Sequence, residues 1–270
     1  MKYAFFTGAA GGLGGASARA MAKEGWTIFA ADINEVALEE IGREENIIPI
    51  KVDITSEESI EAAFNEVSQV TDKLDAVINF SGIHNMSSLV EGDIIKTLEK
   101  MIDINVMGMV RVNKILFPLV EAGKGRIVNC SSECGWMKAQ PFNGPYTITK
   151  YAVEAYSDSL HHEMALLGIP VIKIQPGSFK TNMHADAESG FDRLIGGTTH
   201  YRKALKRMKP LMMIELKMAN DPKYLVEAVL ESVNAVKPKF RYKVKNSKLL
   251  GSMEIIPNSM LGSIYKMILG

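Results

Sequence analysis

A glycine-rich turn near the N-terminus constrains the fold more than any other feature of the sequence. The turn, Thr7-Gly8-Ala9-Ala10-Gly11-Gly12-Leu13-Gly14, follows a short apolar run at 3–7 and leads into helix-forming residues at 13–23. This order predicts a strand, a tight turn and a helix. Glycines let the backbone approach a pyrophosphate closely, and a helix N-terminus offers free amides to its charge. The turn therefore predicts a dinucleotide site, and a turn that only packs helix against strand is the alternative.

The same alternation of apolar runs and helix-forming segments continues along the chain. Further strands are predicted at 27–31, 47–52, 74–80, 125–130 and 240–244, and helices from 34 and at 56–70, 92–117, 146–167 and 221–236. Such alternation predicts an α/β fold, a doubly wound parallel sheet of the Rossmann type with helices on both faces. We expect one domain over residues 1–270, with a substrate lid at 182–220 and a C-terminal extension at 245–270.

Polar residues stand at the ends of the predicted strands, where a doubly wound sheet binds its ligands. These residues are Thr7, Asp32, Asp53, Asn79 and the pair Ser131-Ser132. A carboxylate at the end of the second strand can accept hydrogen bonds from the adenosine ribose and would repel a 2′-phosphate. Asp32 therefore favours NAD over NADP, and capping of the helix that starts at Asn34 is the alternative.

Tyr146 and Lys150 are four residues apart, so on a helix their side chains share one face. Pro145 supports a helix start just before them. A phenol titrates near pH ~10, and a neighbouring ammonium would lower its pKa toward the range of a general base. By itself this spacing is more typical of a solvated helix face, so its meaning depends on the other motifs.

Taken together, these motifs resemble the short-chain dehydrogenase/reductase family over residues 2–183. The resemblance covers the glycine turn, the two aspartates, residues 79–82 and residues 176–181. Asn79-Phe80-Ser81-Gly82 departs from the family's Asn-Asn-Ala-Gly motif at its two central positions. The spacing between the serine pair and Tyr146 indicates a small insertion within 136–144.

The resemblance implies a catalytic tetrad of Asn105, Ser132, Tyr146 and Lys150. Tyr146 would exchange the alcohol proton, Ser132 would hydrogen-bond the substrate oxygen, and Lys150 would lower the tyrosine pKa and bind the nicotinamide ribose. Asn105 would hold a water that links Lys150 to solvent. The implied contacts with NAD are Gly8, Gly12, Leu13, Gly14, Asp32, Ile33, Asp53, Ile54, Asn79, Ser81, Gly82, Tyr146, Lys150, Pro176, Gly177, Phe179 and Thr181.

Residues 151–160 and 176–183 are similar to the retinol and hydroxysteroid dehydrogenase branch of the family. This likeness implies hydride transfer between NAD(H) and a bulky, lipophilic secondary alcohol or ketone, such as a hydroxysteroid, bile acid or retinoid. It also implies a homodimer or homotetramer. The alternatives are a 3-oxoacyl thioester reductase, against which the long segment after Thr181 argues weakly, and an NAD-binding redox sensor without turnover. Retention of Ser132, Tyr146 and Lys150 argues against the sensor.

The predicted lid has two different faces at helical spacing. Tyr201, Leu205, Met208 and Met212 form an apolar face that could close over a hydrophobic substrate, and ordinary packing onto the domain is the alternative. The opposite face is basic, which favours a solvated surface. The methionine-rich tail at 251–270 favours core or interface packing over a membrane surface.

Charge and cysteine content exclude several classes of protein. Thirty-one basic residues balance thirty-one acidic ones, so the overall charge does not favour binding to nucleic acid or an anionic membrane. Cys130, Cys134 and five scattered histidines form no metal-ligand pattern, so no metal is expected. No segment reaches the roughly 18 apolar residues of a spanning helix. We therefore expect a soluble, cytoplasmic protein without stable membrane insertion.

Overall fold

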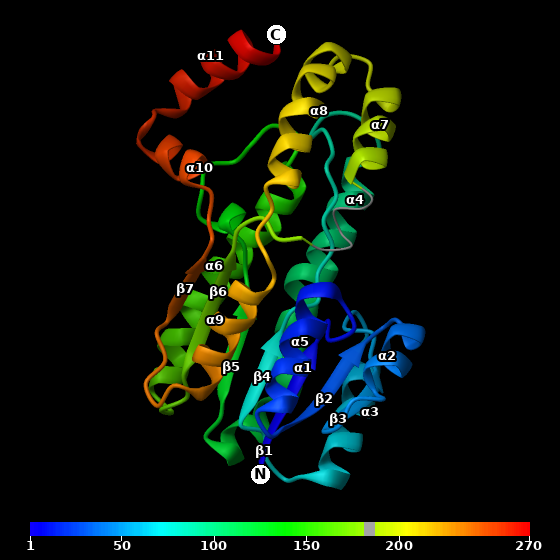
Figure 1. The fold of residues 1–270 in the computed structure, drawn as a ribbon, viewed down its shortest axis with the longest axis vertical. Helices are drawn as coiled ribbons and strands as arrows, with labels where there is room; N and C mark the ends of the chain where they lie inside the picture. Colours follow the sequence, from blue (N-terminus) through cyan, green and yellow to red (C-terminus); the bar gives the residue numbers. More distant parts are fainter. Residues whose placement is uncertain (181–186) are drawn as a thin grey trace.

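The computed structural model describes residues 1–180 and 187–270. Its centre is a parallel sheet of seven strands in the order β3-β2-β1-β4-β5-β6-β7 (Figure 1). The strands are β1 (Lys2–Thr7), β2 (Trp26–Asp32), β3 (Ile47–Lys51), β4 (Ala76–Asn79), β5 (Arg126–Cys130), β6 (Val171–Pro176) and β7 (Arg241–Val244). The direction of winding reverses between β1 and β4, which makes the carboxyl ends of these strands the expected ligand site. The predicted Rossmann fold is confirmed.

Helices connect the strands and extend beyond them. The connecting helices are α1 (Gly12–Lys23), α2 (Glu35–Ile41), α3 (Glu57–Val70), α4 (Ile94–Ile102), α5 (Met109–Gly123), α6 (Gly144–Ala165) and α9 (Lys223–Asn234). The others are α7 (Ala187–Gly197), α8 (Arg202–Lys217), α10 (Lys248–Ser252) and α11 (Asn258–Leu269). Within the described ranges, none of these helices is long and apolar enough to cross a membrane.

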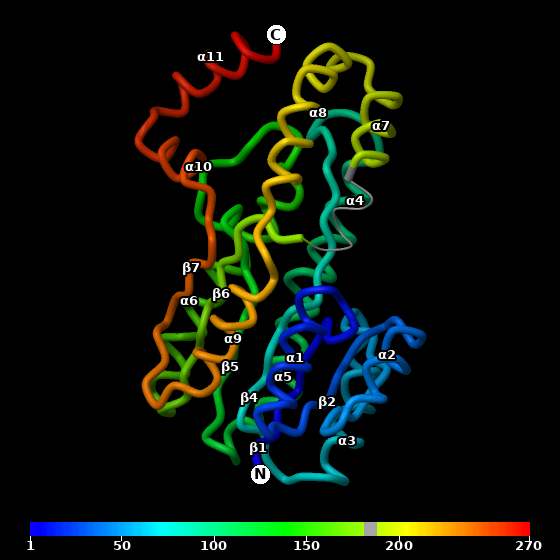
Figure 2. The backbone as a smooth tube through the Cα atoms, in the orientation of Figure 1, coloured from blue at the N-terminus to red at the C-terminus, as the bar shows by residue number. Residues whose placement is uncertain are grey.

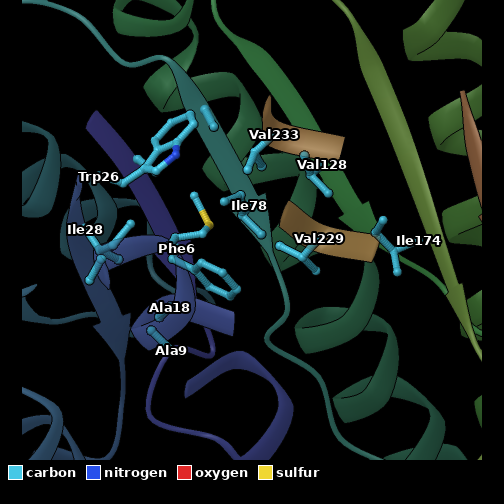
Figure 3. Packing of buried hydrophobic residues seen from close by; sticks show 14 of the residues in the cluster. Phe6, Ala9, Ala18, Trp26, Ile28, Ile78, Val128, Ile174, Val229 and Val233 are labelled. Atoms are coloured by element: carbon cyan, nitrogen blue, oxygen red, sulfur yellow. The ribbon is translucent and has the colours of Figure 1, made fainter. Parts of the chain in front are cut away.

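The sheet is covered on both faces by apolar side chains. Phe5 and Phe6 are consecutive in β1, so they point to opposite faces, yet both are fully buried. Phe6 belongs to a cluster that includes residues of α1 and α9, among them Val229, as Figure 3 shows. Phe5 belongs to a second cluster with residues of α3 and α5. Burial of one such aromatic side chain contributes roughly 1.5–3 kcal/mol, so these two layers hold the strand ends in place.

Strand β6 was not among the predicted strands, because two polar residues interrupt its apolar pattern. Lys173 and Gln175 are fully buried on β6. Their partners come from α6: Lys173 Nζ lies 2.7 Å from Glu154 Oε2 and 2.5 Å from Asp158 Oδ1, and Gln175 Nε2 donates to Glu154 Oε1 at 2.8 Å. A buried charge is tolerated when it is paired in this way. The pairing lies between elements, so the strand sequence alone does not reveal it.

The predicted helical region at 92–117 is interrupted in its middle. A π-helix at Asp103–Gly108 joins α4 to α5, and it contains Asn105. π-Helical turns often occur at functional sites.

The ends of other predicted helices carry the expected capping residues. The side chains of Asn34 and Ser56 accept backbone hydrogen bonds as N-caps of α2 and α3, and Gly168, with φ +71°, follows the end of α6.

The helices α7, α8, α10 and α11 gather beyond the carboxyl ends of the strands, away from the body of the sheet (Figure 2). Leu205 and Met208 of the predicted apolar lid face pack with Phe191 of α7 and Leu269 of α11. These two residues therefore pack against α7 and α11, and closure of this face over a substrate stays a prediction. Glu91, which precedes α4, accepts a hydrogen bond from Thr198 Oγ1 at 2.6 Å and connects α4 to the α7–α8 loop. Residues 182–186 of the predicted lid lie outside the described ranges.

Candidate active site

The glycine turn crosses the end of β1 at very short distances. Gly8 has φ +70°, which favours glycine, and a Cβ there would lie 2.7 Å from the Ser81 amide nitrogen. A Cβ on Gly14 would lie 2.1 Å from the Gly8 carbonyl oxygen. Thr7 Oγ1 accepts hydrogen bonds from Phe80 N at 3.2 Å and Ser81 N at 3.3 Å, so the turn is fixed to the end of β4. No side chain caps α1, and its first turn holds no acidic residue, so its amides remain open to an anion.

Two aspartates stand beside this turn at the carboxyl ends of neighbouring strands, Asp32 as the last residue of β2 and Asp53 just after β3. Asp32 accepts hydrogen bonds from Ala10 N at 3.2 Å and from Asn34 N at 3.1 Å, and Asn34 itself caps α2. Asp32 therefore connects the glycine turn to β2 and is not the helix cap. One oxygen of Asp53 accepts hydrogen bonds from Thr55 Oγ1 at 2.7 Å and Thr55 N at 2.9 Å, and these bonds lower the Asp53 pKa.

The structure separates Asn79 from the other residues at the end of β4. Its Nδ2 donates to Asn113 Oδ1 at 2.8 Å and to Asn129 Oδ1 at 3.0 Å, and Asn129 in turn donates to Ser157 Oγ. Asn79 is buried in this network and does not line the cavity described below. In this structure it joins β4, β5, α5 and α6 within the fold.

Ser132, Tyr146 and Lys150 meet at the carboxyl end of β5. The Tyr146 hydroxyl hydrogen-bonds the Ser132 side chain, whose Oγ also accepts from Cys134 N at 3.2 Å. Lys150 Nζ donates to the Cys130 carbonyl oxygen at 2.9 Å and lies 5.6 Å from the centroid of the Tyr146 ring. Helix α6 begins two residues before Tyr146, so tyrosine and lysine stand on adjacent turns of one face, as predicted.

Burial governs the ionisation of this group. Burial of its hydroxyl raises the Tyr146 pKa above its ordinary value, Cys134 and Cys130 add to the rise, and the bond with Ser132 opposes it. Burial also lowers the pKa of Lys150. Desolvation is the largest of the causes that act on Tyr146, and Lys150 is not among them, so the lowering of the tyrosine pKa by lysine stays a prediction. Tyr146 carries its proton at neutral pH in this cavity.

Asn105 lies behind this group and not in the cavity lining. Its Oδ1 accepts from Ile83 N at 2.8 Å, and its Nδ2 donates to Ile83 O at 2.8 Å and Thr149 Oγ1 at 3.1 Å. Thr149 Oγ1 donates to the Tyr146 carbonyl. Asn105 thus holds the segment after β4 against the first turns of α6, which positions Tyr146.

One cavity of about 690 Å³ brings most of the predicted residues together. The predicted residues that line it are Gly8, Gly12, Leu13, Gly14, Asp32, Ile33, Asp53, Ile54, Ser81, Gly82, Ser132, Tyr146, Lys150, Pro176, Gly177 and Phe179. Thr181 lies outside the described residues. Such a volume suits a small-molecule site.

The cavity has a second set of lining residues that the sequence did not reveal. They include His84, Met86, Glu133, Phe191, Met212, Glu215, Leu216 and Leu250. The His84 ring packs edge-on against Tyr146 with centroids 4.7 Å apart, and its Nε2 lies 2.9 Å from Asn143 Oδ1. Met212 belongs to the predicted apolar lid face and was the one available signal. Glu215 and Leu216 lie on the same helix α8 but outside that face, and the other residues come from separate elements without a shared motif.

The fold and this cavity define a Rossmann-type oxidoreductase. Sequence comparison agrees, since the family model described as short chain dehydrogenase matches residues 2–191. Retinol dehydrogenase 16 of Mus musculus is 31% identical over 257 residues, which cover 89% of this chain and 80% of that protein. The chain therefore belongs to the short-chain dehydrogenase/reductase family.

Other relatives confirm the likeness to the retinol and hydroxysteroid branch. The 17-beta-hydroxysteroid dehydrogenase type 6 of Mus musculus is 35% identical over 196 residues, 71% of this chain and 61% of that protein. Human retinol dehydrogenase 16 is 36% identical over 184 residues, 67% of this chain and 57% of its own length. The matched segment thus spans less than two thirds of these two relatives.

Solved structures share the fold at lower identity. A short-chain dehydrogenase from Streptomyces avermitilis superposes with a TM-score of 0.73 at 23% identity, over 98% of this chain and 94% of that one. A 3-ketoacyl-(acyl-carrier-protein) reductase from Brucella melitensis, complexed with NADH, gives a TM-score of 0.72 at 21% identity over 90% and 96% of the two chains. At such identities the comparison concerns the fold alone.

Proposed function

We propose that this protein transfers a hydride between NAD(H) and a bulky, lipophilic secondary alcohol or ketone. The observation that carries the proposal is the composition of the 690 Å³ cavity described above. It is lined by the glycine turn, by Ser132, Tyr146 and Lys150, and by apolar side chains of α7, α8 and α10. A nucleotide site, a proton-exchanging group and an apolar wall are thereby present in the same space.

The residues of the nucleotide side fit NAD. Gly8 and Gly14 leave a cradle that a Cβ would fill, and the open amides of α1 suit a pyrophosphate. Asp32 would accept hydrogen bonds from the adenosine ribose, and its charge would repel the 2′-phosphate of NADP. Asp53 and Ile54 would border the adenine, and Pro176, Gly177 and Phe179 would border the nicotinamide.

When bound, NAD(H) accepts or supplies the hydride, and the side chains of the protein manage the proton. In reduction, the Tyr146 hydroxyl donates its proton to the ketone oxygen while Ser132 hydrogen-bonds the same oxygen. The raised pKa keeps Tyr146 in this acid form at neutral pH. In oxidation, Tyr146 accepts the alcohol proton, and the Lys150 ammonium beside its ring stabilises the phenolate.

The substrate side of the cavity supports a lipophilic substrate. Met86, Phe191, Met212, Leu216 and Leu250 line it and come from the segment before α4 and from α7, α8 and α10. Apolar lining of this kind favours apolar ligand surface. The names of the relatives, retinol dehydrogenase and 17-beta-hydroxysteroid dehydrogenase, point to the same class of alcohol.

The experiment is NADH formation by the purified protein with a panel of hydroxysteroids, bile acids, retinol and 3-hydroxyacyl thioesters, with Tyr146→Phe alongside. We expect turnover of a bulky alcohol, and a loss of about 10²–10⁴-fold in kcat for Tyr146→Phe, which is the range for removal of a general acid or base. NADH affinity should change little in that variant. Turnover of thioesters alone would replace the proposed substrate class, and NADH binding without any turnover would favour a redox sensor.

A further inference from the structure

The substrate side of the cavity holds a carboxylate among apolar side chains. Glu215 lies on α8, and Met212 and Leu216 of the same helix line the cavity with it. Phe191 of α7 and Leu250 of α10 complete this wall. An acidic side chain in such a wall loses hydration, and burial raises the Glu215 pKa. A ligand that covers this carboxylate must offer it a hydrogen-bond donor, because burial without one is costly.

The protein supplies no such partner among the residues that the structure describes. The side-chain carboxylate of Glu215 makes no hydrogen bond and no ion pair with any residue of 1–180 or 187–270, and the backbone carbonyl of Glu215 accepts from Met218 N. Lys209, a cation on the same helix, is paired instead with Asp192 and Glu188 of α7. Glu215 is half-buried in the cavity wall, so a ligand that fills the cavity would displace water from its carboxylate and would have to supply a hydrogen-bond donor in its place.

A second carboxylate in the cavity, that of Glu133, differs from Glu215 because it has a hydrogen-bond partner within the protein. Glu133 is buried, but its Oε2 accepts a hydrogen bond from Ser247 N at 2.6 Å, so it holds the start of α10. Burial raises its pKa to about 7, and the Ser247 bond opposes that rise. Glu133 therefore has a role within the fold, whereas Glu215 faces the cavity without one.

Glu215 also lies within electrostatic reach of the reacting group. Its charge adds to the raised pKa of Glu133 and of Cys134, the two residues that follow Ser132. Cys134 N donates to the Ser132 hydroxyl, which contacts Tyr146. A substrate whose carbonyl meets Tyr146 would extend along the same cavity past Glu215.

On the basis of the proposed function, we propose that Glu215 is a specificity-determining residue that accepts a hydrogen bond from a second hydroxyl group of the lipophilic substrate. The same carboxylate disfavours substrates that carry a carboxylate at that position, because two like charges in an apolar cavity repel each other. The preferred substrate is therefore a lipophilic hydroxyketone or diol, and carboxylated compounds such as bile acids are poor ligands.

The test uses three steroid ketones that differ only at one position remote from the ketone, with a hydroxyl, a hydrogen or a carboxylate there. Affinity is measured by calorimetry with NADH-saturated protein, and kcat/KM is measured in parallel. A hydrogen bond to a charged group is worth about 1.5–3 kcal/mol, so the hydroxyl compound should bind roughly 10–100-fold more tightly than the deoxy compound. Glu215→Leu should abolish this preference, and Glu215→Gln should improve binding of the carboxylate compound.

Glu227→Gln, an exposed residue on α9 outside the cavity, is the matched control and should leave all three affinities unchanged. Circular dichroism verifies that each variant is folded. The proposed role of Glu215 is overturned if both Glu215 variants change the affinity for all three compounds equally. It is also overturned if the wild type binds none of the compounds. If Glu215→Leu turns over the ketones with the same preference as the wild type, the role of Glu215 is overturned but the proposed function is not. Binding that depends on Glu215 without hydride transfer supports that role and contradicts the proposed function instead.

Discussion

The nucleotide half and the substrate half of the cavity are built in different ways. The nucleotide half uses backbone and short side chains at strand ends, such as Gly14, Asp32 and Asp53, all within the first 55 residues. The substrate half uses single side chains on helices that are far apart in the sequence, such as Phe191 and Leu250. The first half therefore depends on backbone geometry, and the second depends on the identity of a few side chains.

The two halves also differ in how deeply they are embedded. Beneath the nucleotide half, the side chains of Phe5 and Phe6 on β1 are fully buried. On α8, by contrast, Leu211 and Ile214 are 53% and 57% exposed. Elements with fewer buried contacts open and change more readily. We therefore expect substitutions in the nucleotide half to abolish binding, and substitutions in the substrate half to change specificity while the fold persists.

The largest effect is expected for Gly14→Ala. The new Cβ would lie 2.1 Å from the Gly8 carbonyl oxygen, so the turn and α1 must move apart. Overpacking of this kind costs about 1–3 kcal/mol of stability. The displaced amides should weaken NADH binding by about 100-fold or more, measured by fluorescence titration, with thermal unfolding recorded in parallel.

Gly196→Ala is the matched control for that substitution. A Cβ at Gly196 meets no atom within 4 Å, and alanine favours the helix by up to about 1 kcal/mol. NADH affinity should be unchanged, and stability should rise slightly. An NADH affinity in Gly14→Ala equal to that of the wild type would show that the nucleotide does not use this turn.

A smaller effect is expected for Asp32→Ala. Loss of hydrogen bonds to a charged group costs about 1.5–3 kcal/mol, so NADH affinity should fall by roughly 10–100-fold. NADPH affinity should rise, because the repulsion of the 2′-phosphate is removed. Asp72→Ala, which removes an exposed carboxylate outside the cavity, should change neither affinity. Comparable catalytic efficiency of the wild type with NAD and NADP would refute the assignment of Asp32.

The same variant tests whether the two halves act separately. Asp32→Ala should leave the KM for the alcohol nearly unchanged at saturating cofactor. In the double variant with Glu215→Gln, the change in the free energy of transition-state binding should equal the sum of the two single changes within about 0.5 kcal/mol. Distant sites without shared partners are independent. A larger coupling would show that the halves are one cooperative unit.

The nucleotide half was predictable from the sequence because its requirements are local. A turn without side chains, a helix start and a carboxylate at a strand end are readable as neighbouring residues, and the structure places Gly14, Asp32 and Asp53 together in the cavity lining. The four-residue spacing of Tyr146 and Lys150 was readable for the same reason. Asn79 was the exception, because its partners Asn113 and Asn129 come from other elements.

The substrate half was not predictable, because tertiary packing selects its residues. Met212 shares its helix face with Leu205 and Met208 and packs against the same cluster, yet of these three residues Met212 alone also lines the cavity. Strand β6 escaped prediction for a related reason, since Lys173 is acceptable in its buried strand only with Glu154 and Asp158 of α6 opposite it. The tyrosine pKa likewise depends on burial that the spacing of two residues does not report.

The measurement that tests the central claim most directly is deuterium transfer from NADH labelled at both C4 positions to a bulky ketone, followed by mass spectrometry of the product. We expect an alcohol that carries one deuterium at the carbinol carbon, and we expect its formation to fall by about 10²–10⁴-fold in Tyr146→Phe. Label transfer at the same rate in Tyr146→Phe, or tight NADH binding with no labelled alcohol from any bulky ketone, would contradict it.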